Sequence, residues 1–344
     1  MRIIECVPNF SEGLDHAKID RIAAAIEHVP KVELLHVDSG IDANRTVMTF
    51  AGLPEAVIEA AFQSIATAAQ LIDMQAHDGV HPRLGATDVC PLIPVSKVSM
   101  TECVQYAKSL GQRVARELGI PVYLYEKAAQ RPERRNLAAV RRGEYEYLSH
   151  RIKDPAWQPD FGPPELNLRA GATVIGARSF LIAYNVTLDT NDQAVADEIA
   201  GIVRESGRFQ RNANGELKTD SKGERIRIPG KLRACKAIGW TLEEYDKAQV
   251  SMNLTNFSIT PLHVAYETVK KEATQFSVDV LGSEIIGLCP LQALLDSGRY
   301  YLNSAQAQEE QLVEAAIKSL RLNHLEMFHP EKKILDYLIA RHFA

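Results

Sequence analysis

Apolar residues along the first 125 positions of the chain follow two different spacings. Short apolar or alternating runs, which are typical of strands, occur at residues 2–8, 32–38, 45–50, 91–95 and 122–125. Apolar residues three or four positions apart, which are typical of amphipathic helices, occur at residues 15–28, 54–73 and 101–117. Pro54 suits the first turn of its helix, and Thr101 is the predicted cap of the third helix. The first six elements follow the order of a ferredoxin-like (βαββαβ) sandwich.

The same order of elements recurs in the second half of the chain. Strands are predicted at residues 180–186, 232–240, 249–254 and either 278–281 or 284–288, and helices at residues 190–205 and 261–274. We therefore predict an α+β fold of two related ferredoxin-like subdomains with additional helices, although no close residue-level repeat is visible. The predicted divisions are residues 1–178 for the first subdomain, 179–325 for the second and 326–344 for a C-terminal helical tail.

Three stretches do not share this regular pattern. Residues 159–171 are rich in proline and glycine and are predicted to form a loop at a domain boundary. Residues 208–230 are mostly polar and contain three glycines, so we expect an exposed excursion. A basic cluster between residues 131 and 142 either forms a solvated helical face or attracts anions. Its members are Arg131, Arg134, Arg135, Arg141 and Arg142.

Composition narrows the classes of function. The chain has 344 residues, of which 46% are hydrophobic and 24% charged, so it is long enough for two globular domains. Its net charge of −5 and pI near 6.1 do not favour partners such as nucleic acid or an acidic membrane surface. No apolar run of about 18 residues occurs, so we expect no membrane span. Cysteines at positions 6, 90, 103, 235 and 289 include no CxxC pair, which indicates reduced thiols in the cytoplasm.

Residues 77–91 concentrate ionisable side chains on a loop shaped by glycine and proline. His77 and His81 are four residues apart, but Gly79 and Pro82 oppose a helix, and zinc needs at least three protein ligands. We therefore expect no metal. The two histidines could simply hold the loop together by hydrogen bonds. The interpretation that we favour is general acid–base chemistry by His81. The neighbours expected to set its electrostatic field are Arg83 and Asp88.

Longer motifs connect the chain to a known family. The opening motif, CVPNFSEG, occupies residues 6–13, and a second long motif, HPRLGATDVCP, occupies residues 81–91. Shorter matches occur at Asp38 and at residues 44–46, 121–125, 159–163, 176–185, 237–240 and 249–254. In these motifs, which follow in the same order over essentially the whole chain, the sequence resembles the glutamate formimidoyltransferases.

The resemblance implies a one-carbon transferase. Members of this family move a formimidoyl group from N-formimidoyl-L-glutamate to N5 of the co-substrate tetrahydrofolate and release L-glutamate, in histidine degradation. They consist of two related α/β subdomains with a substrate cleft between them, and they form homodimers. The chain resembles the stand-alone form, because it ends without the cyclodeaminase domain of the animal members. Any cyclisation of the product is therefore expected on another protein.

The family's site residues match defined positions of this chain. The catalytic histidine falls on His81, which would act as a base and then as an acid. Asp38 is expected to orient His81 or to stabilise the cationic carbon, unless it only caps the turn before Gly40. The folate-contacting segment falls on Gly162, Pro163, Pro164, Glu165, Leu166, Asn167, Leu168, Arg169, Ala170 and Gly171.

Both substrates carry glutamate carboxylates, which need fixed cations or amides. The arginine fork suits a carboxylate, although each candidate could instead form a structural ion pair. The arginines in matched motifs are Arg45, Arg83 and Arg178. Amides at strand ends or turns could pair with the pterin edge or cap a turn; these are Asn9, Asn44, Asn185 and Asn253. Because no covalent intermediate is required, Cys6 and Cys90 are predicted to be core thiols.

Two other functions stay open at the level of the sequence. A related enzyme could cyclise 5-formyltetrahydrofolate at the same folate site, but it would need ATP, and the chain has no GxxxxGK[ST] loop. The two halves could also form a regulatory module that binds folate without chemistry. Such a module would bind its ligand equally well without His81.

Overall fold

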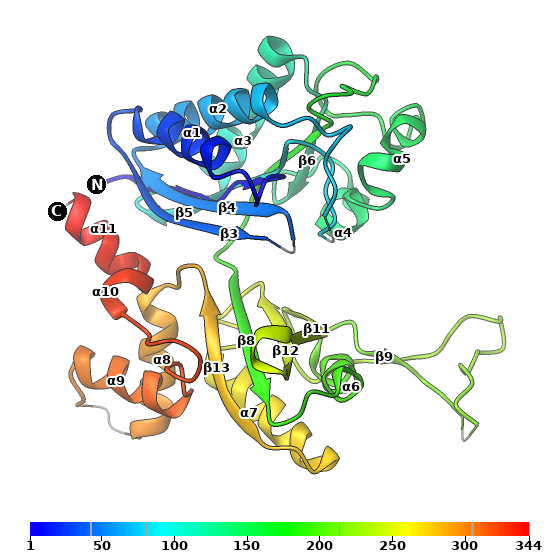
Figure 1. The fold of residues 1–344 in the computed structure, drawn as a ribbon, viewed down its shortest axis with the longest axis vertical. Coiled ribbons are helices and arrows are strands. Elements are labelled where there is room, and N and C mark those ends of the chain that lie inside the picture. Colours follow the sequence, from blue (N-terminus) through cyan, green and yellow to red (C-terminus); the bar gives the residue numbers. More distant parts are fainter. Residues whose placement is uncertain (42, 80, 213, 304–305, 344) are drawn as a thin grey trace. The chain divides into compact units, whose positions relative to one another are not determined.

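The computed structural model describes residues 1–41, 43–79, 81–212, 214–303 and 306–343, and it divides into two compact units. The first unit comprises Met1–Ser179 and His342–Ala344, and the second comprises Phe180–Arg341 (Figure 1). Each unit contains its own sheet and its own hydrophobic core. The predicted α+β class with two subdomains is therefore confirmed.

The first unit contains a seven-stranded sheet, whose strands come from the beginning of the chain and from later parts of the unit. Its strands are β1 (Ile3–Cys6), β2 (Asn9–Phe10), β3 (Val32–Gly40), β4 (Arg45–Gly52), β5 (Thr87–Ser96), β6 (Val122–Glu126) and β7 (Thr173–Ala177). Their order across the sheet is β3, β4, then β1 and β2 together, then β5, β7 and β6. The pairs that join β7 to β5 and to β6 are parallel, whereas the other pairs are antiparallel. Strand β7 was not predicted from the sequence.

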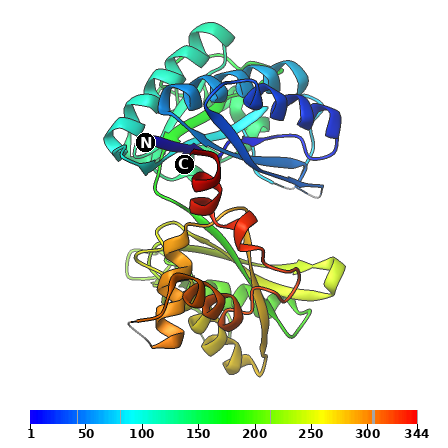
Figure 2. The same ribbon diagram turned by 90° about the vertical axis from the view of Figure 1, so that its left-hand side faces the viewer.

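Helices cover both faces of this first sheet. One face packs against α1 (His16–Glu27), α2 (Pro54–Leu71) and α3 (Met100–Leu118), which lie side by side (Figure 2). The opposite face of β5, β6 and β7 packs against the short helices α4 (Leu137–Val140) and α5 (Glu144–Arg151). Helix α3 is capped by Ser99 in a capping box with Glu102, so the prediction of Thr101 as its cap is wrong.

The second unit has an antiparallel sheet with the order β11 (Cys235–Leu242), β12 (Lys247–Leu254), β8 (Ile182–Leu188) and β13 (Val280–Ile286). Alternate residues of β8 and β12 point into its core, where they meet the helices. The helices are α6 (Gln193–Val203), α7 (Leu262–Ala273), α8 (Leu291–Leu302) and α9 (Glu309–Ser319). The chain ends with α10 (Pro330–Lys333) and α11 (Leu335–Phe343), and single 3₁₀ turns occupy η1 (Pro132–Arg134), η2 (Glu243–Tyr245) and η3 (Thr274–Phe276).

The polar excursion predicted at residues 208–230 has some regular structure. Strands β9 (Arg208–Phe209) and β10 (Arg227–Ile228) pair in an antiparallel ladder, and further bridges extend it outward (Figure 1). Arg225 and Arg227 lie over the ring of Phe209.

In the part of the chain that the structure describes, no helix has the length and apolar character needed to cross a membrane.

Candidate functional site

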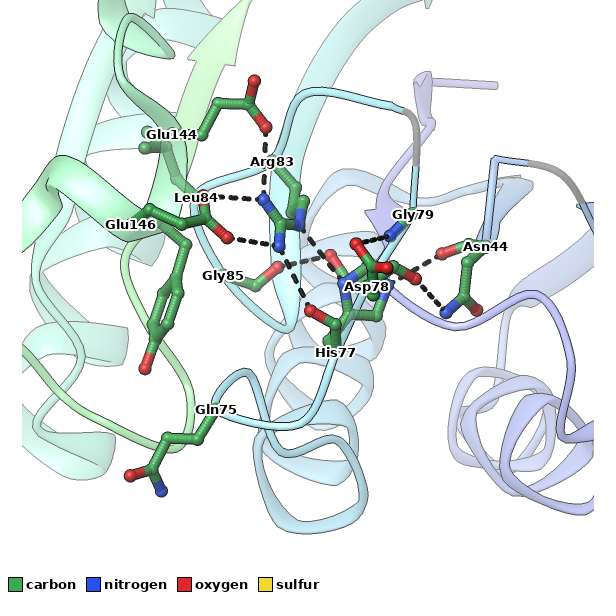
Figure 3. Close-up of polar contacts among 12 residues, drawn as sticks. Asn44, Gln75, His77, Asp78, Gly79, Arg83, Leu84, Gly85, Glu144 and Glu146 are labelled. Atoms are coloured by element: carbon green, nitrogen blue, oxygen red, sulfur yellow. Dashed lines mark hydrogen bonds and ion pairs between the residues drawn. The ribbon is translucent and has the colours of Figure 1, made fainter.

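The loop between α2 and β5 is anchored at Arg83, whose side chain is only 7% exposed. Its Nε donates to Nδ1 of His77 at 3.2 Å, and its Nη2 donates to the carbonyl oxygen of His77 at 3.1 Å. The same guanidinium forms ion pairs with Glu146 at 2.6 Å and with Glu144 at 3.2 Å (Figure 3). Since these carboxylates already occupy its fork, Arg83 acts here as a structural ion-pair partner that ties the loop to α5.

Asn44 connects three segments around the start of the same loop. Its Oδ1 accepts from the backbone N–H of Gly13 at 2.9 Å, and its Nδ2 donates to the carbonyl oxygen of Asp78 at 2.6 Å. Its own carbonyl oxygen lies 3.0 Å from Nε2 of His77 (Figure 3). A Cβ at Gly79 would lie 2.7 Å from the carbonyl oxygen of Ala43, so glycine is required for this close approach.

His81, the predicted catalytic residue, is partly buried and accepts a hydrogen bond at Nε2 from Nη1 of Arg45. Because an arginine N–H can only donate, the imidazole is neutral and carries its proton on Nδ1. That Nδ1 atom is buried and has no hydrogen-bond partner of acceptable geometry. Burial, Arg45 and Arg141 together lower the pKa of His81 to about 3, against a small opposing effect from the backbone of Pro82.

Arg45 lies on β4, and its side chain is partly buried. Burial and the neighbouring Arg141 lower its pKa, whereas the carboxylates of Asp88 and Asp38 act in the opposite direction. Among the described residues, no carboxylate lies within ion-pair distance of its guanidinium. Arg45 is therefore a cation whose fork is engaged mainly by a neutral imidazole.

Asp88 and Arg141 form a buried ion pair beside these two residues. Asp88 is 1% exposed, and its Oδ1 accepts from the backbone N–H of Leu84 at 3.0 Å and from Nε of Arg141 at 3.3 Å. Its Oδ2 accepts from Nη2 of Arg141. The sequence pointed to Arg141 only as part of the basic cluster, because its partner lies far earlier in the chain.

The basic cluster is not a uniform solvated face. Arg134 is fully buried and pairs with Asp160 at 2.7 Å, and it also donates to the carbonyl oxygen of Gln158. Arg142, by contrast, is exposed. The prediction of a solvated helical face is therefore wrong for Arg134.

Asp38 lies on β3 opposite Val47 and is partly exposed. Its carboxylate raises the pKa of Arg45, so it acts on the site through that guanidinium. In the described part of the chain, the hydrogen-bond partner of the His81 imidazole is Arg45, and no bond joins it to Asp38. The expected orientation of His81 by Asp38 is therefore not seen as a direct hydrogen bond, and stabilisation of the cationic carbon of a substrate by Asp38 stays a prediction.

The predicted folate-contacting segment lies against the end of the loop. Ala86 donates to the carbonyl oxygen of Ala170 at 2.9 Å, and Gly85 pairs with Gly171 in an isolated bridge. The first part of the segment, residues 162–165, is exposed, and so is Leu168. The fold therefore places residues 167–171 beside the loop that carries His81, although they are far from it in sequence.

Three other predicted site residues form hydrogen bonds outside the group around His81. Arg178, which is partly buried, donates to the carbonyl oxygen of Ser179 at 3.0 Å. Asn9 on β2 donates to the carbonyl oxygen of Val7 at 3.2 Å. In the second unit, Asn185 donates to Oε1 of Glu284 at 3.1 Å, and the amide of Gln249 donates to the same oxygen. Sequence reasoning missed Gln249 and Glu284 because nothing local marks two such residues as partners of Asn185.

The cysteines and the metal-ligand residue types show no catalytic arrangement. Cys6 and Cys90 are free and buried, with their sulfur atoms 3.5 Å apart, and burial raises the pKa of the Cys6 thiol well above its ordinary value. Among the residues that the structure describes, no group of three or more His, Cys, Asp or Glu side chains is placed to hold a metal ion. The strongest chemical arrangement is the charged group around His81.

Comparison with known proteins agrees with the resemblance drawn from the motifs. Residues 3–178 match the family model of the formiminotransferase domain, N-terminal subdomain, and residues 183–340 match that of the formiminotransferase domain. The chain is 46% identical to formimidoyltransferase-cyclodeaminase of Rattus norvegicus, over 98% of this chain and 60% of that protein. The chain thus spans about 60% of the length of this relative and of its animal counterparts.

Shorter relatives are matched over most of their own length. Glutamate formimidoyltransferase of Streptococcus pyogenes serotype M1 is 44% identical, over 88% of this chain and 93% of that protein. The protein of the same name from Thermoplasma acidophilum is 43% identical, over 91% of this chain and 97% of that protein. Since two family models together cover nearly the whole chain, this protein belongs to the formiminotransferase domain family.

Proposed function

We propose that the protein transfers the formimidoyl group of N-formimidoyl-L-glutamate to N5 of tetrahydrofolate and releases L-glutamate. Two relatives that match this chain over most of their length are named glutamate formimidoyltransferase. The observation that carries the proposal is the neutral imidazole of His81, set among Arg45, Arg141, Asp38 and Asp88. Charged groups collected around one histidine are typical of acid–base sites.

The reaction needs one group that can both accept and deliver a proton. The amidine carbon of the donor lies between two nitrogens and is electrophilic when protonated. N5 forms a bond to this carbon, and the bond from the carbon to the glutamate nitrogen then breaks. One proton leaves N5 and one reaches the departing nitrogen, so His81 would accept the first and deliver it to the second. Such help is typically worth about 10²–10⁴-fold in rate.

Arg45 must release Nε2 of His81 before this proton transfer. With a pKa of about 3, the imidazole is a weak base at neutral pH. An anionic substrate bound at Arg45 would turn the guanidinium toward a carboxylate and offset its positive charge. Both changes raise the basicity of His81. Asp38, which already acts on Arg45, would stabilise the cationic donor or keep Arg45 in place.

Tetrahydrofolate is proposed to lie along residues 162–171. This segment offers the exposed apolar side chain of Leu168 and the exposed cation of Arg169, which suit a ring system and a glutamate carboxylate. Backbone bonds hold it against the catalytic loop, which would keep the co-substrate near His81. Orientation of two substrates alone can supply roughly 7–11 kcal/mol of the barrier.

We further propose a cytoplasmic homodimer that works in histidine degradation without a metal. The five free, buried cysteines suit a reducing compartment. The acid–base mechanism uses only side chains, and it requires no metal ion. The dimer rests on the family resemblance, and the molar mass in solution, measured by light scattering, tests it.

The first experiment measures glutamate release from N-formimidoyl-L-glutamate with and without tetrahydrofolate. His81→Ala is measured in parallel, and binding of tetrahydrofolate to both proteins is measured separately. We expect release that depends on tetrahydrofolate, reduced at least about a hundredfold in a variant that still binds. A protein that binds folate but releases no glutamate would refute the transferase. A variant as fast as the parent would refute the role of His81.

A further inference from the structure

Arg141 carries the inference that goes beyond the matched motifs. It follows α4, and it reaches Asp88 on β5 with two nitrogens of its guanidinium, Nε and Nη2. Its side chain is 15% exposed, so it is not fully enclosed by this ion pair. Among the described residues, its remaining nitrogen, Nη1, has no hydrogen-bond partner. Nε and Nη2 of Arg141 are therefore fixed by Asp88, whereas Nη1 is available to bind a ligand.

The sheet brings Arg45 and the ion pair of Arg141 to the same region, because Phe10 of β2 pairs with Thr46 of β4 on one side and with Thr87 of β5 on the other. Arg45 precedes Thr46, and Asp88, which holds Arg141, follows Thr87, so positive charge is concentrated here. Each of the two guanidinium groups is close enough to lower the pKa of His81, and Arg141 also lowers the pKa of Arg45. Asp88 is already engaged by Arg141 and by the backbone N–H of Leu84. The two guanidinium groups repel each other, and an anion bound near both would offset this repulsion.

The chemistry of the two arginines selects the ligand. Paired guanidinium groups match the planar, bidentate geometry of a carboxylate. The fixed contact with Asp88 orients the Arg141 fork in advance, which lowers the entropy lost when a ligand binds. Both proposed substrates carry such groups on a glutamate moiety.

We propose that Arg45 and Arg141 form one carboxylate-binding subsite beside His81, with Asp88 as the residue that positions Arg141. This inference rests on the proposed function, because it assigns a carboxylate of a glutamate-bearing substrate to this subsite. The carboxylate belongs either to the amino-acid donor or to the glutamate moiety of the folate. In either case its binding draws Arg45 away from Nε2 of His81.

The test compares Arg141→Gln with Arg142→Gln, which removes the same charge from an exposed neighbouring position. Steady-state kinetics give KM for N-formimidoyl-L-glutamate and for tetrahydrofolate, together with kcat. Arg141→Gln should raise KM for one of the two substrates by about tenfold to a hundredfold, the range for a lost charge-assisted contact, with a smaller change in kcat. Arg142→Gln should leave both KM values within about twofold of the parent protein.

Tetrahydropteroate, which lacks the glutamate moiety, separates the two sources of carboxylate. An increased KM for N-formimidoyl-L-glutamate assigns the subsite to the donor. An increased KM for tetrahydrofolate that is absent with tetrahydropteroate assigns it to the folate. If the folded Arg141→Gln protein keeps both KM values, or if Arg142→Gln has the same effect, the subsite is refuted and Arg141 is only the structural partner of Asp88.

Two further measurements keep the subsite testable by itself. If Arg141→Gln does not unfold cooperatively, Arg141→Lys replaces it, because lysine keeps the charge beside Asp88 but cannot bridge two acceptors with a planar fork. The same increase in KM is then expected, and unchanged KM values would refute the subsite. If the parent protein shows no transfer, calorimetric binding of L-glutamate is compared between the parent and Arg141→Gln. Loss of affinity of at least tenfold supports the subsite although the proposed function has failed, whereas equal affinity refutes it.

Discussion

We expect acidification to lower the free energy of unfolding more through protonation of His81 than through protonation of an exposed histidine with an ordinary pKa. The pKa of a free histidine is near 6.5, whereas burial and the two arginines lower that of folded His81 to about 3. Between these values the unfolded chain binds a proton at this position and the folded protein does not. The stability that the neutral imidazole contributes is therefore complete above pH 6.5 and is lost as the pH falls toward 3.

The size of this effect follows from the width of the window. Each pH unit corresponds to about 1.4 kcal/mol, so acidification from pH 6.5 to pH 5 costs about 2 kcal/mol at most. Because the ring is not fully buried, solvent screening reduces this cost to about 1–2 kcal/mol. We expect the free energy of unfolding of the parent protein to fall by this amount more than that of His81→Asn over the same pH interval.

The assay is urea unfolding at pH 7 and at pH 5 for the parent, His81→Asn and Arg45→Gln. Arg45→Gln should show a smaller acid loss than the parent, because it removes one of the causes that lower the pKa of His81. His16→Asn, which replaces an exposed histidine, shows what the loss of a histidine does in general. Parallel losses of stability in the parent and in His81→Asn would refute the reasoning, since no proton uptake could then be assigned to this residue.

Three further predictions test other parts of the fold. Arg83→Gln removes two ion pairs with exposed carboxylates and two bonds to His77, so urea unfolding should show a loss of about 2–3 kcal/mol; a loss below about 0.5 kcal/mol would contradict the anchoring role. A Cβ at Gly171, where φ is +67°, would lie 2.2 Å from the carbonyl oxygen of Leu84, whereas Gly119 at φ +64° has no atom within 4 Å. Thermal unfolding should therefore show a loss above about 2 kcal/mol for Gly171→Ala and about 1 kcal/mol for Gly119→Ala, and equal losses would contradict the contact. The buried Cys6 should react with a thiol reagent only after unfolding, and rapid labelling of the native protein would contradict its burial.

The sequence by itself determined many of the helices and strands, although not β7, and it located the loop rich in ionisable residues. Hydrophobic spacing is a local property, so it predicted β3, β4, α2 and α3 to within a few residues. The motif at residues 81–91 made His81 the candidate for acid–base chemistry, because a histidine between proline, glycine and charged residues is visible without knowledge of the fold. The family followed from motifs in the same way, and the comparisons confirm it.

Only the tertiary structure decided which charges meet. The partners of Arg83 lie more than sixty positions away on α5, and those contacts turned a candidate for substrate binding into a structural anchor. Arg141 lies near His81 because it forms an ion pair with Asp88 on β5. The imidazole of His81 is hydrogen-bonded to Arg45 and not to Asp38. Ion pairs and hydrogen bonds depend on distances of a few ångströms between segments that the sheet brings together, and hydrophobic spacing along the chain contains no information on those distances.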